Sequence, residues 1–230
     1  MQESYEMNIS VLCGIFLLPL IFGLAIYAFI RYIKLKWEKR FLELAAATQF
    51  QYLPSSQNAP YRRRGMSRGS PVLLGRIDHF SCLIWLYESR SARSTMNNRN
   101  MGTLRHYTKL EVHLPLSLNL GLKIEPELSS LTSLFDLFTG DIQINDEVFD
   151  KMFRIKAHDP NAVYQFLTPQ RKMTLYNAQQ SISQLGALHI TDTMVEAEMH
   201  GGKLSPDEII FVMKQLVAVA HQVSSLPLQR

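Results

Sequence analysis

The residues with the most versatile chemistry are seven histidines and two cysteines in a chain of 230 residues. No two histidines stand four residues apart and no Cys-x-x-Cys pair occurs, so spacings typical of zinc sites are absent. Cys82 lies in the apolar stretch FSCLIW, where a thiol usually packs in the core rather than acting as a nucleophile. His113, His189 and His200 lie in predicted strands and could share one face of a sheet, although isolated strand histidines are usually solvated. The sequence therefore predicts neither a metal site nor covalent catalysis.

Four acidic residues form a second cluster, Asp141, Asp146, Glu147 and Asp150. They are close enough to suggest a calcium loop, but the pattern D-x-[DN]-x-[DN]-G and its glycine are absent. Asp146 and Asp150 are instead predicted to hydrogen-bond nearby backbone at a turn. The Gly-rich phosphate motifs G-x-x-x-x-G-K and G-x-G-x-x-G are absent as well. The sequence accordingly predicts no cofactor, and an enzyme of unrecognised type remains the alternative to a binding module.

Residues 9–30 form an uncharged, apolar stretch of 22 residues. At about 1.5 Å per residue, such a helix is roughly 33 Å long, enough to cross a hydrocarbon core of about 30 Å. A cleaved signal peptide fits less well, because residues 1–8 carry no Lys or Arg. A buried soluble helix rarely has an uncharged run of this length. The sequence therefore predicts a single transmembrane helix that stays as an anchor.

Lysine and arginine follow this apolar stretch and are absent before it. The positive-inside rule then places the N-terminus outside and the remainder of the chain in the cytoplasm. The predicted organisation is a short extracytoplasmic N-terminus (1–8), a transmembrane helix (9–30), a basic juxtamembrane helix (31–52) and a cytoplasmic domain (53–230).

The charge is polarised along the chain, although the net charge is only +4. Residues 1–110 hold 15 Lys and Arg against 6 Asp and Glu, a net charge of +9, whereas residues 111–230 hold 9 against 14, a net charge of −5. A basic surface favours contact with anionic lipid headgroups, and a solvated loop is the alternative for its arginine-rich part. Nucleic acid is not favoured as a partner, because no stacking aromatic residues are interleaved with the cations. The predicted lipid contacts are Arg31, Lys34, Lys36, Lys39, Arg40, Arg62, Arg63, Arg64 and Arg68.

The rest of the chain alternates between predicted strands and helices. Two β-hairpins are predicted, one at 72–89 turning at Asp78-His79 and one at 187–201 turning near Asp192-Thr193. The single strands are predicted at 107–115, 121–128 and 149–158, with a loop at 90–105. The helices are predicted at 37–52 and 129–138, and from starts at Pro160, at Pro169 and at the capping box of Ser205 and Glu208.

The segment TGDIQINDEVFDKMFRIKAHDPNAVYQFLTPQRKMTL, residues 139–175, contains G-D-x-x-x-x-D-x-x-F-D-x-x-F before a Pro-started helix. In this segment, and more loosely over 37–222, the chain resembles domains of uncharacterised bacterial membrane proteins. The resemblance implies a bacterial inner-membrane protein of unknown function and brings no catalytic residues. The expected fold is α+β, an N-terminal transmembrane helix followed by a cytoplasmic domain of antiparallel strands flanked by helices. The expected function is a membrane-anchored binding module for a protein partner or an anionic lipid surface.

Overall fold

The computed structural model describes the backbone of residues 9–54, 56, 57, 61, 66, 70–90, 104–127, 141–200 and 205–225. The chain divides into two compact units, residues 1–43 and residues 44–230. Helix α1 (Ile9–Thr48) forms the described part of the first unit and ends within the second. It ends earlier than the predicted limit of residue 52, because Gln49 takes a left-handed conformation with φ of 59°. The Thr48 hydroxyl then accepts a hydrogen bond from the Phe50 N–H at 3.3 Å.

The predicted membrane anchor is contradicted. Among the residues that the structure describes, no helix combines the length and the apolar character needed to cross a membrane. The transmembrane part of the predicted fold is therefore wrong. The single-pass topology and the inner-membrane localisation that depended on it are contradicted by the same finding.

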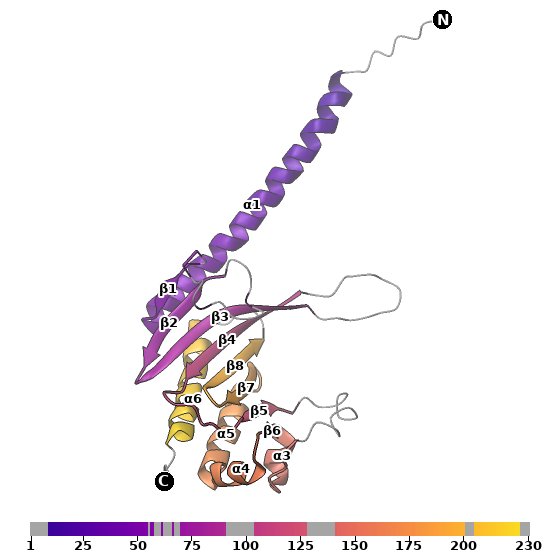
Figure 1. Ribbon diagram of the computed structural model, residues 1–230. Coiled ribbons are helices and arrows are strands. Elements are labelled where there is room, and N and C mark those ends of the chain that lie inside the picture. The colour runs from indigo at the N-terminus through magenta and orange to yellow at the C-terminus, as the bar shows by residue number, and fades with distance from the viewer. Residues whose placement is uncertain are drawn as a thin grey trace, which may run out of the picture. The chain divides into compact units, whose positions relative to one another are not determined.

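Eight antiparallel strands of the second unit form one sheet, in the order β1-β2-β3-β4-β8-β7-β5-β6 (Figure 1). The strands are β1 (Gln51–Leu53), β2 (Val72–Ile77), β3 (Phe80–Arg90), β4 (Leu104–His113), β5 (Lys123–Pro126), β6 (Phe153–Lys156), β7 (Gly186–Thr191) and β8 (Met194–His200). Both predicted hairpins form, β2 with β3 and β7 with β8. Asp78 turns the first with a positive φ of 54°. The second hairpin lies between β4 and β5, which joins all the described strands into one sheet.

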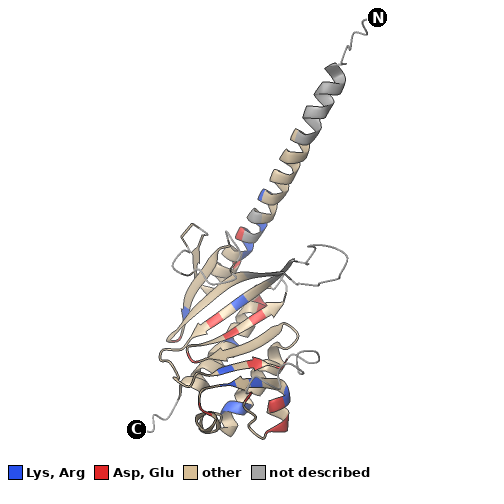
Figure 2. Ribbon diagram, turned by 45° about the vertical axis from the view of Figure 1, so that its right-hand side comes forward, with Lys and Arg blue, Asp and Glu red and all other residues tan. Residues whose placement is uncertain are grey.

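The two faces of this sheet differ in polarity, as alternation along each strand requires. On one face, strand residues such as Leu110, Val195 and Leu188 are fully buried. Helix α6 (Pro206–Ser224) packs against β4 and β8, and α5 (Pro169–Ile182) packs against β7 and α6, so these helices cover that face. The other is here called the charged face, and Figure 2 shows acidic and basic positions across its strands. It carries Lys109, Glu111, His113, Lys123, Glu125, His189, Glu196 and Glu198.

The three C-terminal helices begin where the sequence predicts. Asp159 and Thr168 cap α4 (Pro160–Phe166) and α5, each of which has proline at its first position. Ser205 and Glu208 form the predicted capping box of α6. The whole predicted apolar stripe of α6 is buried, which identifies it as the side that meets the sheet: Ile209, Val212, Met213, Leu216, Val219, Ala220 and Val223.

Arg171 fixes α5 to its neighbours. This buried guanidinium donates to the carbonyls of Phe166 at 2.8 Å, Gln222 at 3.1 Å and Ser225 at 3.3 Å. The acceptors lie at the C-terminal ends of α4 and α6, where helix carbonyls lack internal partners and the helix dipole is negative. Burial lowers the pKa of Arg171 from its usual value. A buried cation thus holds three helix ends together.

The predicted strand at 149–158 is wrong in its first half. The structure instead has helix α3 (Glu147–Met152) followed by β6. The Asp146 side chain caps α3 by accepting from the Phe149 N–H at 3.3 Å. Asp150 accepts from the N–H groups of Ile144 and Asp146, as the predicted turn role of these two acids anticipated. Most of the predicted loop at 90–105 and all of the predicted helix at 129–138 lie outside the described residues.

Candidate functional site

The predicted lipid-contact residues are only partly within the described structure. Arg31, Lys36 and Lys39 are exposed on α1, Arg40 is half-buried, and the Lys39 ammonium lies 3.9 Å from the Glu43 carboxylate. The side chain of Lys34 and the cluster Arg62, Arg63, Arg64 and Arg68 lie outside the described residues. The structure therefore places four of the nine side chains on one helix and leaves their contact with lipid a prediction.

The charged face holds an ordered set of hydrogen-bonded charges. Glu111 is only 2% exposed and accepts from the Trp85 indole N–H at 2.6 Å. The other carboxylate oxygen of Glu111 lies 3.1 Å from the Nε2 of His113. The Lys109 ammonium donates to Glu196 at 3.0 Å and lies 3.9 Å from Glu198. These charges are matched with one another, which is what buried and half-buried ionic groups require.

The three strand histidines share the charged face without forming a site. His113 lies opposite Met194 in the register of β4 and β8, and His200 stands six residues further along β8, about 20 Å away. His189 lies opposite Glu196, and its Nδ1 is 3.7 Å from the Glu125 carboxylate. Burial lowers the pKa of His189, an effect that the nearby glutamates oppose. Across the described ranges, no group of three or more His, Cys, Asp or Glu side chains could hold a metal ion.

The predicted packing role of Cys82 fits its position. The residue is fully buried in β3, and burial raises the pKa of its thiol to about 11. A thiol with that pKa is almost entirely protonated at neutral pH and is therefore a poor nucleophile.

The prediction of no covalent catalysis rested on Cys82, but the sequence also has a Gly-x-Ser-x-Gly pattern at 65–69, the pattern of some serine nucleophiles. In a nucleophile elbow this pattern lies between a strand and the helix that follows it. Here the element that follows is strand β2, which begins at Val72, so the local context does not match. Apart from Met66, these residues lie outside the described part of the chain.

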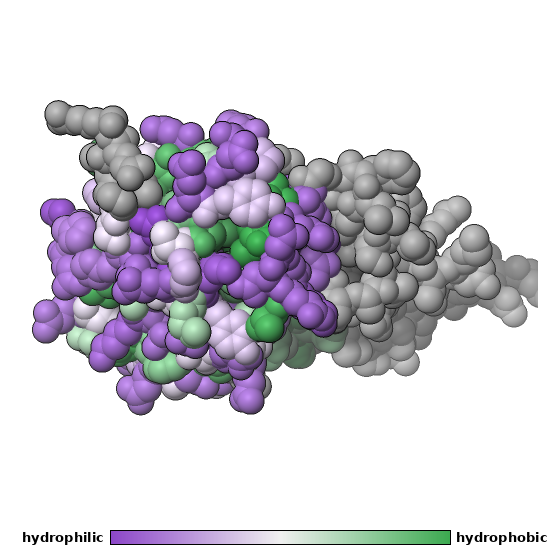
Figure 3. All heavy atoms as spheres, turned by 90° about the horizontal axis from the view of Figure 1, so that it is seen from below, coloured by the Kyte–Doolittle hydropathy of each residue, from purple (hydrophilic) through white to green (hydrophobic). Residues whose placement is uncertain are grey.

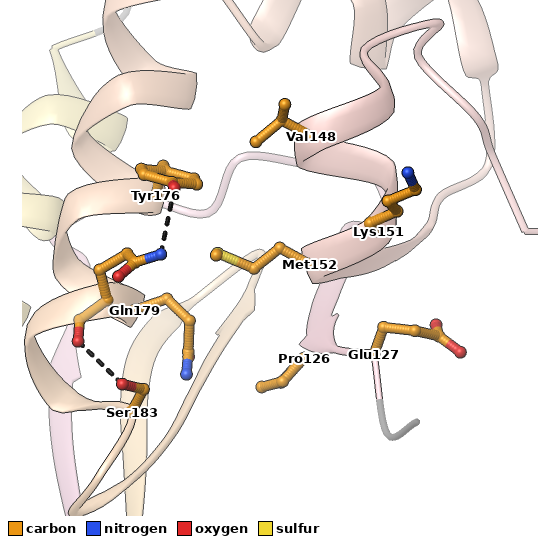
Figure 4. A pocket seen from close by; sticks show the side chains of 9 residues that line it. Pro126, Glu127, Val148, Lys151, Met152, Tyr176, Gln179 and Ser183 are labelled. Atoms are coloured by element: carbon orange, nitrogen blue, oxygen red, sulfur yellow. Dashed lines mark hydrogen bonds between the residues drawn. The ribbon is translucent and has the colours of Figure 1, made fainter. Parts of the chain in front are cut away.

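Two adjoining hollows lie between α3 and α5, and together they are called the α3–α5 groove. The larger has a volume of about 450 Å³ and is lined by Pro126, Glu127, Val148, Lys151, Met152, Tyr176, Gln179, Gln180 and Ser183 (Figure 4). The smaller has a volume of about 370 Å³ and is lined by Asp146, Val148, Phe149, Pro169, Lys172, Met173 and Tyr176. Val148 and Tyr176 line both, so the hollows share a common boundary.

The groove exposes apolar side chains at its mouth. Val148 on α3 and Met173 on α5 are each 60% exposed, whereas Phe149 beneath them is buried. Seen from the end that carries α3, α4 and α5, hydrophobic surface lies in hollows between hydrophilic side chains (Figure 3). Apolar surface that is recessed and rimmed by polar groups is typical of a binding groove.

The polar groups of the larger hollow are oriented by local hydrogen bonds. Gln179 is 8% exposed, and its side-chain oxygen accepts from the Leu188 N–H of β7 at 2.8 Å. The Gln180 amide donates to the Tyr176 hydroxyl at 3.1 Å, which leaves the hydroxyl proton available to an acceptor. In Figure 4 the end of the Gln179 side chain points toward the space between Ser183 and Pro126.

The smaller hollow ends at an ion pair. The Lys172 ammonium donates to the Asp146 carboxylate, and this hydrogen bond is the main reason that the pKa of Asp146 is lowered. The N–H of Phe149 lowers it further. Asp146 is thus held as an anion between a helix N-terminus and a lysine, which fixes α3 against α5.

The groove has no direct signal in the sequence. Its α3 wall was predicted as a strand, and the link from Gln179 to Leu188 joins residues whose proximity depends on the packing of α5 on β7. The available signal was the Asp146-Glu147 pair, because an Asp cap followed by Glu in the first turn favours a helix start.

Comparison with known proteins supplies no family. No family model and no curated protein matches this chain. Among solved structures, the crystal structure of the mycobacterial trehalose monomycolate transport factor A, TtfA, is similar to this chain with 11% sequence identity and a TM-score of 0.46. The match covers 82% of this chain and 97% of that one. A likeness at this level carries no inference about function.

Proposed function

We propose that this chain is a binding module whose α3–α5 groove takes an extended, apolar peptide segment of a protein partner. The observation that carries the proposal is the pair of adjoining hollows with Val148 and Met173 exposed at their mouths. Covering exposed apolar side chains with a ligand makes the binding free energy more favourable, by about 25 cal/mol for each Å² of apolar surface removed from water.

The length of the groove favours a peptide over a small molecule. Its α5 wall runs from Pro169 to Ser183, fourteen residues apart, or about 21 Å of helix. An extended peptide spans about 3.3 Å per residue, so roughly six residues fit along this wall. Two hollows along one wall can take two separate apolar side chains of such a segment, which is how peptide grooves gain specificity.

The ionisable groups of the groove favour binding over catalysis. Asp146 is the groove-lining residue with a shifted pKa, and its shift is downward. A general acid or base that works near neutral pH needs a pKa near neutrality. The Asp146 carboxylate is also occupied by Lys172 and by the Phe149 N–H. A structural role in holding α3 accounts for these contacts.

A peptide selection tests the proposal. A random decapeptide phage library is panned on the purified full chain. The enriched peptides are then labelled with a fluorophore and titrated with the protein by fluorescence anisotropy. Met173→Glu is expected to weaken binding at least tenfold, because it places a carboxylate at the mouth of the smaller hollow. Leu116→Glu is the matched control, since Leu116 is 74% exposed and lies between β4 and β5. Failure to enrich any peptide, or equal binding by both variants and the unchanged chain, contradicts the proposal.

A further inference from the structure

The larger hollow lies where the pairing of β5 and β7 stops. These strands pair at Lys123 with Thr191 and at Ile124 with Ile190, and both strands then continue. Two residues further on, the same register would place Pro126 opposite Leu188. The Leu188 N–H instead donates to the side-chain oxygen of Gln179 at 2.8 Å. A glutamine amide from α5 therefore replaces the partner strand at this point of the ladder.

The geometry fixes which end of the Gln179 amide faces the hollow. Because its oxygen accepts from a backbone N–H, the nitrogen is at the other end and carries two hydrogens. Gln179 lines the larger hollow, and its side chain points toward the space beside Pro126 (Figure 4). Within the described part of the chain, this nitrogen has no hydrogen-bond partner. A donor on a side chain that is 8% exposed thus faces a cavity with its hydrogens free.

We infer that Gln179 is the residue that recognises a backbone carbonyl of the bound peptide. This inference rests on the proposed function of the groove. The amide group of Gln179 has the donor and acceptor of a peptide unit, and it extends the β7 ladder by one hydrogen bond toward the ligand. Leu188 donates to Gln179, and Gln179 donates to the peptide. Main-chain hydrogen bonds of this type contribute affinity when an extended chain binds.

The surroundings of Gln179 favour a neutral carbonyl over a carboxylate. The lining includes the apolar residues Pro126, Val148 and Met152, and Gln179 itself is uncharged. Lys151 lies at the rim, where it is exposed and paired with Glu147 at 2.6 Å. Glu127 adds a negative charge on the same hollow, paired with Arg154 at 3.2 Å. Among the described residues that line this hollow, an anionic ligand group would meet this carboxylate and a single rim cation.

The test replaces the donor and keeps the acceptor. Gln179→Glu retains an oxygen for the Leu188 N–H but presents a second oxygen, in place of the nitrogen, to the hollow. Binding of the decapeptides selected on the unchanged chain is expected to fall at least tenfold, the effect of one lost hydrogen bond of about 1.4 kcal/mol. Gln165→Glu, at an exposed glutamine of α4, controls for the added charge and should leave binding unchanged.

A spectroscopic readout on the unchanged chain covers the case in which Gln179→Glu does not fold. The side-chain ¹⁵N–¹H₂ resonances of Gln179 should move downfield when the selected decapeptide is added, because a new acceptor engages the amide. Peptides that bind Gln179→Glu as tightly as the unchanged chain, or Gln179 resonances that do not move at saturation, overturn the role of Gln179. If that happens while Met173→Glu still weakens binding at least tenfold, the groove is retained as the binding site and only the role of Gln179 is rejected.

Discussion

The charged face of the sheet and the α3–α5 groove both carry ionisable and polar groups, but they use them in opposite ways. On the charged face, Glu111 is engaged by Trp85 and His113, and Lys109 by two glutamates. In the groove, the Gln179 nitrogen and the Tyr176 hydroxyl proton face open volume. The first set stabilises the sheet, whereas the second is available to a ligand.

This difference shows that a density of charge is a poor guide to a binding site. The charged face has the larger number of titratable groups, yet they are matched with one another across neighbouring strands. The groove has few charges and one buried amide whose donor points into a cavity. Changes on the charged face should therefore alter stability without altering peptide binding, whereas changes to groove groups that face the ligand should alter peptide binding.

The largest effect is expected from Glu111→Ala. Removing this buried carboxylate leaves the Trp85 N–H without that acceptor and opens a small cavity, at a cost of about 3 kcal/mol in the free energy of unfolding. Urea denaturation of the full chain measures the loss. Glu147→Ala removes an exposed glutamate and should cost less than about 0.5 kcal/mol. Equal stability of the two variants would show that the charged face does not stabilise the sheet.

A smaller effect is expected from Gln179→Leu, which tests the other side of the comparison. The Leu188 N–H loses its acceptor, at a cost of about 1–3 kcal/mol. Gln179→Glu retains an acceptor and should be the more stable of the two variants in the same denaturation assay. If Gln179→Leu is as stable as the unchanged chain, then the bond to Leu188 contributes nothing to folding.

The charged face should also respond to mild acid through His189. Its folded pKa is depressed, so the unfolded chain takes up a proton first as the pH falls. The stability from keeping His189 neutral is present above about pH 6.5, the unfolded value, and decreases as the pH falls from there toward the folded pKa. His189→Gln should flatten the dependence of the unfolding free energy on pH in this range. An unchanged slope would contradict the assignment.

The smallest effect is expected at the ion pair of the smaller hollow. The folded pKa of Asp146 is depressed, so its contribution is present above about pH 3.8 and is lost as the pH falls through the lower folded value. Asp146→Asn should remove this part of the acid dependence while it lowers stability only slightly at pH 7, because the pair is partly exposed. Acid titration monitored by circular dichroism distinguishes the two chains.

Elements with local causes were predictable from the sequence. The Ser205–Glu208 capping box and the turn at Asp78 depend on residues a few positions apart, and both form. Helix α3 was missed because Phe149, Phe153 and Ile155 suggested a strand, whereas the Asp146 cap favours a helix. The groove depends on α5 lying beside the point where β5 and β7 separate. No spacing of residues in the sequence predicts this packing. The membrane anchor was inferred from hydropathy alone, and the described part of α1 does not support it.

Methionine methyl groups provide the most direct measurement of where a peptide binds. Met152 and Met173 lie in the groove, Met194 lies beside His113 on the charged face, and Met213 is buried in α6. In a chain labelled with ¹³C-methyl methionine, addition of a selected decapeptide should shift Met152 and Met173 and leave Met194 and Met213 in place. A shift of Met194 without a shift of either groove methionine would contradict the assignment of binding to the α3–α5 groove.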